Sequence, residues 1–118
     1  MNVASINAFI GSPGVAAYAT SKHAILGLAR SACQEFAPHK IRINTVCPGL
    51  IDTDMQRDIA SRVAGEDAEN FEHPLVARTP MGRMSDPSEI ANAVLWFASG
   101  EASYVTGSTL VLDGGLTA

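Results

Sequence analysis

The stretch IRINTVCPG, residues 41–49, determines the fold class that the sequence predicts. Residues 41–47 form a β-branched run of strand length, and Pro48 and Gly49 are expected to end it. The pattern over 15–36 is helical, so this run follows a helix closely. Such an order is typical of a parallel sheet, in which a helix joins each strand to the next.

The elements on either side continue this alternation. Residues 2–5 (NVAS) are typical of the end of a strand, and residues 108–115 (STLVLDGG) predict a buried strand. A helix is expected over 87–99, because Asp86 can cap it and Glu89 stands at the matching position of a capping box. The sequence therefore predicts an α/β fold with three parallel strands, covering helices and right-handed crossovers.

The segment 50–84 differs from the rest, because it is acid-rich and has no single period. Short helices are expected over 54–63 and 66–76. Three strands are few for a parallel sheet, and two helices leave one edge and part of one face uncovered. Residues 1–118 are therefore expected to form one partial domain.

Composition narrows the function classes. Hydrophobic residues make up 47% of the chain, and the formal net charge is −4 without any block of lysines or arginines. This balance excludes a nucleic-acid binder, whose affinity depends on clustered cations. No apolar run is long enough to span a membrane. Cys33 and Cys47 lack metal-ligand spacing, so we expect a reduced, cytoplasmic protein without a metal site.

Three residues could form a proton-transfer device. Tyr18 and Lys22 stand four positions apart on the first helix and so share a face. A free tyrosine is a poor base because its pKa is about 10, and a neighbouring ammonium favours the phenolate. Ser5 lies thirteen positions before Tyr18 at the end of a strand, where active sites of parallel sheets collect. The alternative is that the tyrosine–lysine pair merely decorates the helix.

The sequence resembles the C-terminal half of a short-chain dehydrogenase/reductase. The resemblance covers residues 2 to about 115 and rests on NVAS, YATSK, IRINTVCPGLIDTDM, PMGRMSDPSEIANAVLWFAS and ASYVTGSTLVLDGG, in that order. It implies the C-terminal part of a Rossmann-like, doubly wound parallel sheet. It also implies that Ser5 orients and polarises a carbonyl, that Tyr18 is the general acid/base, and that Lys22 favours the phenolate and binds the nicotinamide ribose.

The resemblance extends to the cofactor and the substrate. It implies NAD or NADP bordered by Tyr18, Lys22, Pro48, Gly49, Ile51 (through its backbone) and Thr53. Segment 50–84 would be a substrate lid, with Met55, Phe71 and Leu75 as candidate lining residues. The family's glycine-rich TGxxxGxG turn, its residue that selects NAD or NADP, and its catalytic asparagine are absent from these residues. The N-terminal dinucleotide-binding half is thus expected to be absent.

Two functions follow from these observations. The first is an NAD(P)-dependent oxidoreductase that interconverts a small alcohol and a carbonyl, as a homo-oligomer. The second is a truncated, inactive fragment that keeps the family's oligomerisation surface. The alanine-rich face of 16–33 suits such a surface, because its small side chains allow a partner subunit to approach closely.

Four further residues have simpler interpretations. We expect His73 to be solvated, Arg83 to pair locally and Asp113 to be a turn residue beside two glycines. Asn44 is expected to satisfy backbone groups at a strand, and the resemblance makes it a conformational anchor.

Overall fold

The computed structural model describes residues 1–118, apart from the side chain of Glu69, and measures 55 × 28 × 24 Å. Its sheet has three strands in the order β1-β2-β3, which are β1 (Asn2–Val3), β2 (Thr45–Pro48) and β3 (Thr109–Leu112). Both strand pairs are parallel. The predicted strands around 2–5, 41–47 and 108–115 are therefore confirmed as neighbours in one parallel sheet, although each is shorter than expected.

Three α-helices and four short 3₁₀ helices complete the fold. The α-helices are α1 (Ala16–Phe36), α2 (Asp54–Ala64) and α3 (Pro87–Ala98). The 3₁₀ helices are η1 (Ile6–Ala8), η2 (Ala37–His39), η3 (Gly65–Asn70) and η4 (Gly100–Ala102). The capping box that predicts α3 is present, because Asp86 accepts from the Ser88 amide and Glu89 accepts from the Asp86 amide.

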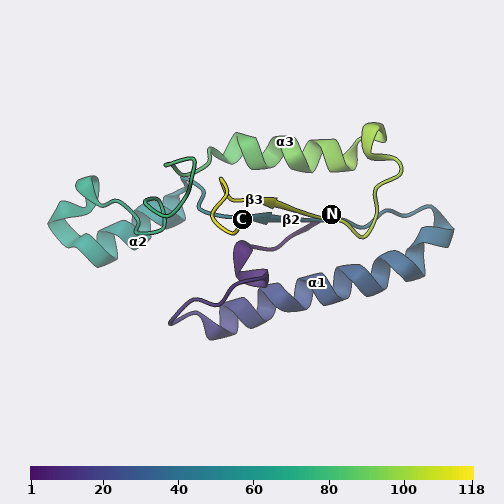
Figure 1. Cartoon of the computed structure of the whole chain (residues 1–118), viewed down its shortest axis with the longest axis horizontal. Helices are drawn as coiled ribbons and strands as arrows, with labels where there is room; N and C mark the ends of the chain where they lie inside the picture. Colours follow the sequence, from purple (N-terminus) through teal and green to yellow (C-terminus); the bar gives the residue numbers. More distant parts are fainter.

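Helices cover both faces of the sheet (Figure 1). Adjacent residues of β2 alternate between the faces: Cys47 packs with Leu26 of α1, and Val46 packs with Phe97 of α3. Val46 and Cys47 are completely buried, as expected for a central strand between two helical layers. The doubly wound arrangement is thus confirmed for the part of the sheet that this chain forms.

The crossovers depart from the prediction in one respect. The strands follow one another across the sheet in a single direction, whereas α1 and α3 lie on opposite faces. A connection that continues in the same direction but changes face must reverse its hand. The two crossovers therefore have opposite hands, and only one of them is right-handed.

Asn44 directly precedes β2, which begins four residues later than predicted. Its buried side chain donates to the Val105 carbonyl (2.7 Å) and accepts from the Ser108 amide (3.0 Å). These bonds take the place of ladder bonds, so regular pairing starts one residue later, with Thr45 opposite Thr109.

Arg42 ties the amino end of the sheet to the last turn of α3. Its guanidinium donates to the carbonyls of Phe97 (2.8 Å), Ser99 (3.0 Å) and Val105 (3.3 Å). These acceptors include carbonyls at the end of α3, which the helix cannot satisfy internally. One side chain thus joins β2, α3 and the approach to β3.

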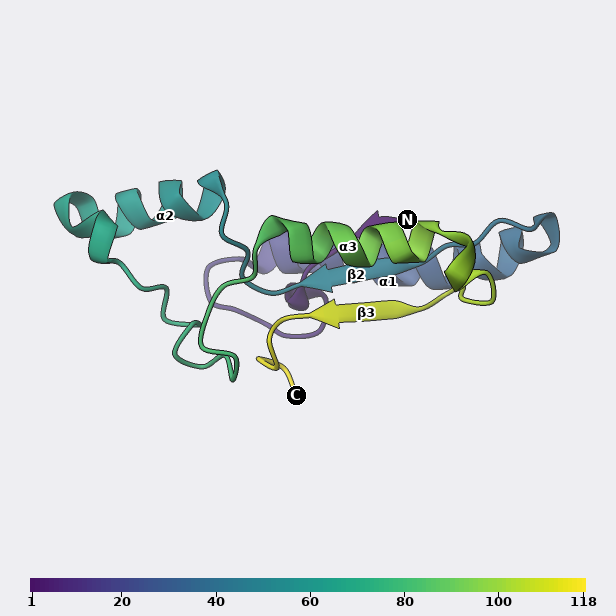
Figure 2. The same ribbon diagram turned by 90° about the horizontal axis from the view of Figure 1, so that it is seen from above.

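Segment 50–84 extends beyond the carboxyl ends of the strands (Figure 2). Helix α2 matches the helix expected over 54–63, but the helix expected over 66–76 is wrong: η3 ends at Asn70 and turns follow. Pro74 lacks an amide hydrogen and disfavours a helical residue before it, which explains the break. None of the described helices is both long and apolar enough to cross a membrane.

Candidate functional site

The carboxyl ends of the strands border a groove of about 710 Å³. Ser5 and Gly49, which follow β1 and β2, line it together with Tyr18 of α1. Residues of segment 50–84 form the opposite wall. The parallel sheet thus brings segments far apart in sequence to one edge, as expected for ligand sites in such folds.

Ser5 is held in place by its own backbone turn. It caps η1, and its Oγ accepts a hydrogen bond from the Asn7 amide at 3.2 Å. The side chain is buried to 9% exposure yet borders the groove. Because the Asn7 amide occupies a lone pair of Oγ, the hydroxyl hydrogen is free to donate to a ligand.

Tyr18 and Lys22 lie side by side on α1, as their spacing predicts. The Lys22 Nζ is 5.3 Å from the centroid of the Tyr18 ring, within the range of a cation–π contact. Tyr18 is half exposed and lines the groove that Ser5 borders. The structure therefore brings Ser5 and Tyr18 to one groove and places the ammonium beside the tyrosine.

Cys47 is buried beneath this group. Burial raises the pKa of the Cys47 thiol, whereas a hydrogen bond with the Ser5 backbone and the charge of Lys22 lower it. The thiol is completely inaccessible, which makes it a packing residue and not a nucleophile. Among the described residues, no group of histidine, cysteine and acidic side chains could hold a metal ion.

The segment after β2 offers backbone groups to a ligand. Ile51 forms an isolated parallel bridge with Ser85, and the bonds of this bridge come from the Leu50 carbonyl and the Asp52 amide. The amide and carbonyl of Ile51 itself therefore point away from Ser85. Thr53 begins α2 without using its hydroxyl as a cap, so that hydroxyl is also left for other partners.

Gly49 is required where β2 ends. A Cβ at this position would lie 2.9 Å from the Cα of Asp113, closer than real Cβ contacts come. The chain after β2 thus passes directly against the end of β3. This close approach holds Pro48 and Gly49 at the edge of the sheet and so sets the position of Leu50 and Ile51, which follow.

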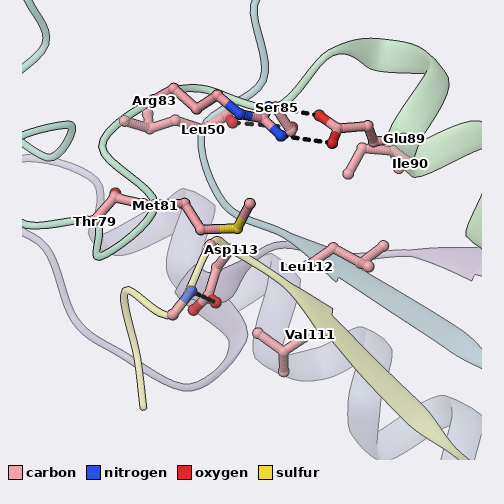
Figure 3. A pocket seen from close by; sticks show the side chains of 12 residues that line it. Leu50, Thr79, Met81, Arg83, Ser85, Glu89, Ile90, Val111, Leu112 and Asp113 are labelled. Carbon is pink, nitrogen blue, oxygen red and sulfur yellow. Dashed lines mark hydrogen bonds and ion pairs between the residues drawn. The ribbon is translucent and has the colours of Figure 1, made fainter.

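A second, smaller pocket of about 310 Å³ lies beside the end of β3 (Figure 3). The guanidinium of Arg83 binds both carboxylate oxygens of Glu89, at 2.7 and 2.8 Å, across one side of it. This bond is the main cause that lowers the pKa of Glu89 to about 2. Asp113 accepts from the Gly115 amide, as expected of a turn residue. The local pairing predicted for Arg83 and the turn role predicted for Asp113 are both confirmed.

Two predicted lining residues reach the groove and one does not. Met55 and Leu75 line it, whereas Phe71 borders a neighbouring pocket and contacts His73 edge to face. His73 is half-buried and not simply solvated, because its Nδ1 accepts from the Leu75 amide at 3.2 Å. Burial lowers the pKa of His73, which favours the neutral ring.

Sequence reasoning missed the polar residues of the groove's outer wall. Gln56, His73 and Arg78 line the groove, and so does Thr117 from the C-terminal end. These residues belong to no motif and have no regular spacing. Only the three-dimensional paths of segment 50–84 and of the C-terminal end bring them to the groove that Tyr18 lines.

Comparisons with known proteins agree with this geometry. The family model described as "Enoyl-(Acyl carrier protein) reductase" matches residues 1–117. A short-chain dehydrogenase of Penicillium roqueforti is 43% identical over 119 residues, which cover 99% of this chain and 41% of that protein.

Solved structures give the same result. Ligand-free aldohexose dehydrogenase of Thermoplasma acidophilum has a TM-score of 0.91 and 41% identity, over 98% of this chain and 46% of that structure. A 3-oxoacyl-[acyl-carrier protein] reductase with bound NAD from Brucella melitensis has a TM-score of 0.79 and 36% identity, over 99% of this chain and 40% of that structure. The chain therefore belongs to the short-chain dehydrogenase/reductase family of oxidoreductases, and it spans about two fifths of the length of the curated relatives it matches.

Proposed function

We propose that this chain carries the catalytic part of an NAD(P)-dependent oxidoreductase that interconverts an alcohol and a carbonyl. One observation carries the proposal: Ser5 and Tyr18 border one groove, and the Lys22 ammonium lies over the tyrosine ring. A hydroxyl donor and a tyrosine assisted by a cation are the groups that proton transfer at a carbonyl oxygen requires.

Each residue has a defined role in this proposal. Tyr18 gives its hydroxyl proton to the substrate oxygen during reduction and takes a proton back during oxidation. Ser5 donates a hydrogen bond to the same oxygen through its hydroxyl hydrogen, while its Oγ accepts from the Asn7 amide. Lys22 places a positive charge beside the ring of Tyr18, with its Nζ 5.3 Å from the ring centroid.

The donor set of this chain fits the nicotinamide end of a dinucleotide. The Lys22 ammonium can bind ribose hydroxyls, the Ile51 amide and carbonyl can bind a carboxamide, and the Thr53 hydroxyl adds a further donor. Pro48 and Gly49 would border the ring at the end of β2. When bound, the dinucleotide supplies or accepts the hydride.

We further propose that segment 50–84 acts as the substrate lid. Met55 and Leu75 supply apolar contacts from this segment, which faces Tyr18 across the groove. The exposed Leu28 on α1, beside a glycine with open space around it, supports self-association through this helix as a homo-oligomer.

Turnover in two proteins tests the proposal. The first is the chain itself, and the second is a chimera in which the N-terminal portion of the Thermoplasma acidophilum enzyme precedes residue 1. We expect the chain alone to bind NADH and NADPH weakly, because its sequence lacks the glycine-rich turn, and we expect the chimera to reduce carbonyl compounds.

Tyr18→Phe in the chimera should lower kcat by at least about a thousandfold while cofactor affinity, measured by calorimetry, changes little. Thr20→Val, a neighbouring change on α1, serves as the control, because the Thr20 hydroxyl bonds only to the Ala16 carbonyl in the described structure. A folded, cofactor-binding chimera that is inactive would favour the inactive-fragment alternative. A Tyr18→Phe variant that retains full turnover would contradict the role of Tyr18 as general acid/base.

A further inference from the structure

The groove is lined by basic side chains and by no acidic side chain of the described residues. The chain contains 12 acidic residues and only 8 lysines and arginines, yet none of the described residues that line the groove is acidic. Its lining includes the guanidinium-bearing Arg78 and the imidazole of His73. Although the chain has a net negative charge, no described carboxylate lines the groove that Tyr18 and Ser5 border.

Arg78 differs from the other arginines of segment 50–84. Arg57, Arg62 and Arg83 each form an ion pair with an aspartate or glutamate. Arg78 makes no ion pair with any carboxylate that the structure describes. Its five N–H donors are therefore available to a ligand in the groove.

The backbone that carries Arg78 is anchored on both sides. The Val76 amide donates to the His73 carbonyl (2.7 Å), and the Thr79 amide donates to the Val76 carbonyl (3.0 Å). Val76 and Thr79 are both buried, so the turn between them is fixed to the body of the protein. Arg78 thus projects from a held turn and not from a free loop.

This turn is attached to the β3 side of the sheet. The Met81 amide donates to the Gly114 carbonyl at 3.1 Å, and Gly114 follows β3. Ser5 follows β1, at the opposite side of the sheet. A ligand that reaches from Ser5 toward Arg78 therefore crosses the carboxyl ends of the strands.

His73 adds a donor to the same wall. Its Nδ1 accepts the Leu75 amide, which assigns the proton of the neutral ring to Nε2. The N–H at Nε2 is then free to bind an acceptor in the groove that His73 lines. Arg78 and His73 together form a wall of donors with affinity for oxyanions.

We infer that the substrate carries a carboxylate, which binds Arg78 and His73 while its carbonyl or hydroxyl carbon lies at Tyr18 and Ser5. This inference rests on the proposed function, because it assigns the occupant of the same groove. A groove of about 710 Å³ has room for an oxo acid or hydroxy acid of the size of a small metabolite.

Calorimetric titration of the chain with two matched probes tests the inference. The probes are levulinate and levulinamide, ketones of equal length that end in a carboxylate and an uncharged amide. We expect levulinate to bind about tenfold more tightly than levulinamide, as for one charge-assisted contact in a half-exposed site.

Three variants assign this preference to a residue. Arg78→Gln should reduce the preference for levulinate to less than about twofold, whereas Arg78→Lys should retain most of it. Arg62→Gln is the matched control, because Arg62 also lies in segment 50–84 but pairs with Asp58 and does not line the groove. It should leave the preference unchanged, and thermal unfolding verifies that all variants are folded.

Four results would overturn the inference: equal affinity for both probes, binding of neither, an equal loss in Arg78→Gln and Arg62→Gln, or a loss in Arg78→Gln of NADH affinity alone. The last would mean that Arg78 holds the dinucleotide's phosphates. Turnover in the chimera tests the proposed function separately. A levulinate preference without any turnover would contradict the proposed function only, and turnover without the preference would contradict this inference only.

Discussion

The sheet with α1 and α3 and the segment 50–84 are held together by different interactions. Val46 and Cys47 are completely buried between helices that are distant in sequence. In contrast, no residue of α2 is buried, and its ion pairs join residues at most five positions apart, such as Arg62 with Asp58. Exposed local contacts open at a small free-energy cost, whereas long-range packing opens only when the domain unfolds.

The two walls of the groove are therefore held by different kinds of contact. Ser5 and Tyr18 belong to the wall that the sheet and α1 hold in a fixed geometry. Met55 and Gln56 belong to the wall formed by α2, none of whose residues is buried. The geometry of Ser5 and Tyr18 thus depends on different contacts from those that hold α2.

The same substitution in each region tests this comparison most strongly. Val46→Ala removes two methyl groups from the completely buried core and should lower the free energy of unfolding by about 2 kcal/mol. Val63→Ala in α2, where the side chain is 67% exposed, should change it by less than about 0.5 kcal/mol. Urea unfolding measures both values, and an equal loss would show that α2 is packed as firmly as the sheet.

The helix caps allow a smaller test. Asp86 forms both bonds of a capping box at the start of α3, whereas Thr53 at the start of α2 makes no side-chain cap. Asp86→Ala should therefore lower Tm by about 5 °C. Thr53→Ala should leave Tm within the error of a calorimetric scan. A comparable fall in both variants would contradict the difference in capping.

The smallest expected effect concerns acid stability at α3. The Arg83 hydrogen bond lowers the pKa of Glu89 from 4.5 to about 2, so the folded state favours the carboxylate. The resulting stability is present above about pH 4.5 and is lost as the pH falls toward 2. Because the pair is exposed, the effect is partly screened and should shrink further in high salt.

Glu89→Gln measures this contribution. The variant should have a lower Tm than the parent at pH 6, and the difference should shrink as the pH falls below 4.5 toward 2, because the parent progressively loses the stability that the ionised Glu89 contributes. Arg83→Gln should show the same convergence. A difference between Glu89→Gln and the parent that does not change between pH 6 and 3 would mean that charge at this position does not stabilise the fold.

The sequence predicts the sheet well and segment 50–84 poorly, for a physical reason. The start of α3 follows from Asp86 and Glu89, because a capping box is a local signal. The start of β2 was misjudged, since the side chain of Asn44 replaces ladder bonds by reaching residues sixty positions away. The reversal of crossover hand likewise depends on which face α3 covers, and no local pattern specifies that.

The candidate site divides in the same way. Ser5, Tyr18 and Lys22 could be selected beforehand, because a strand end and a helical spacing place them. His73 and Arg78 could not, because turns without a period bring them to the groove. Residues that a regular element positions are predictable from spacing, and residues that an irregular segment positions are not.

The hydrogen bonds from Arg42 to three carbonyls lie away from the groove, and this separation matters for how the chain can evolve. Arg42 thereby joins the segment before β2 to the end of α3 and to the segment before β3, at the amino end of the sheet. Substitutions at Gln56, His73 or Arg78 do not touch this tie. Residues that line the groove can therefore be substituted during evolution without loss of the hydrogen bonds that Arg42 makes.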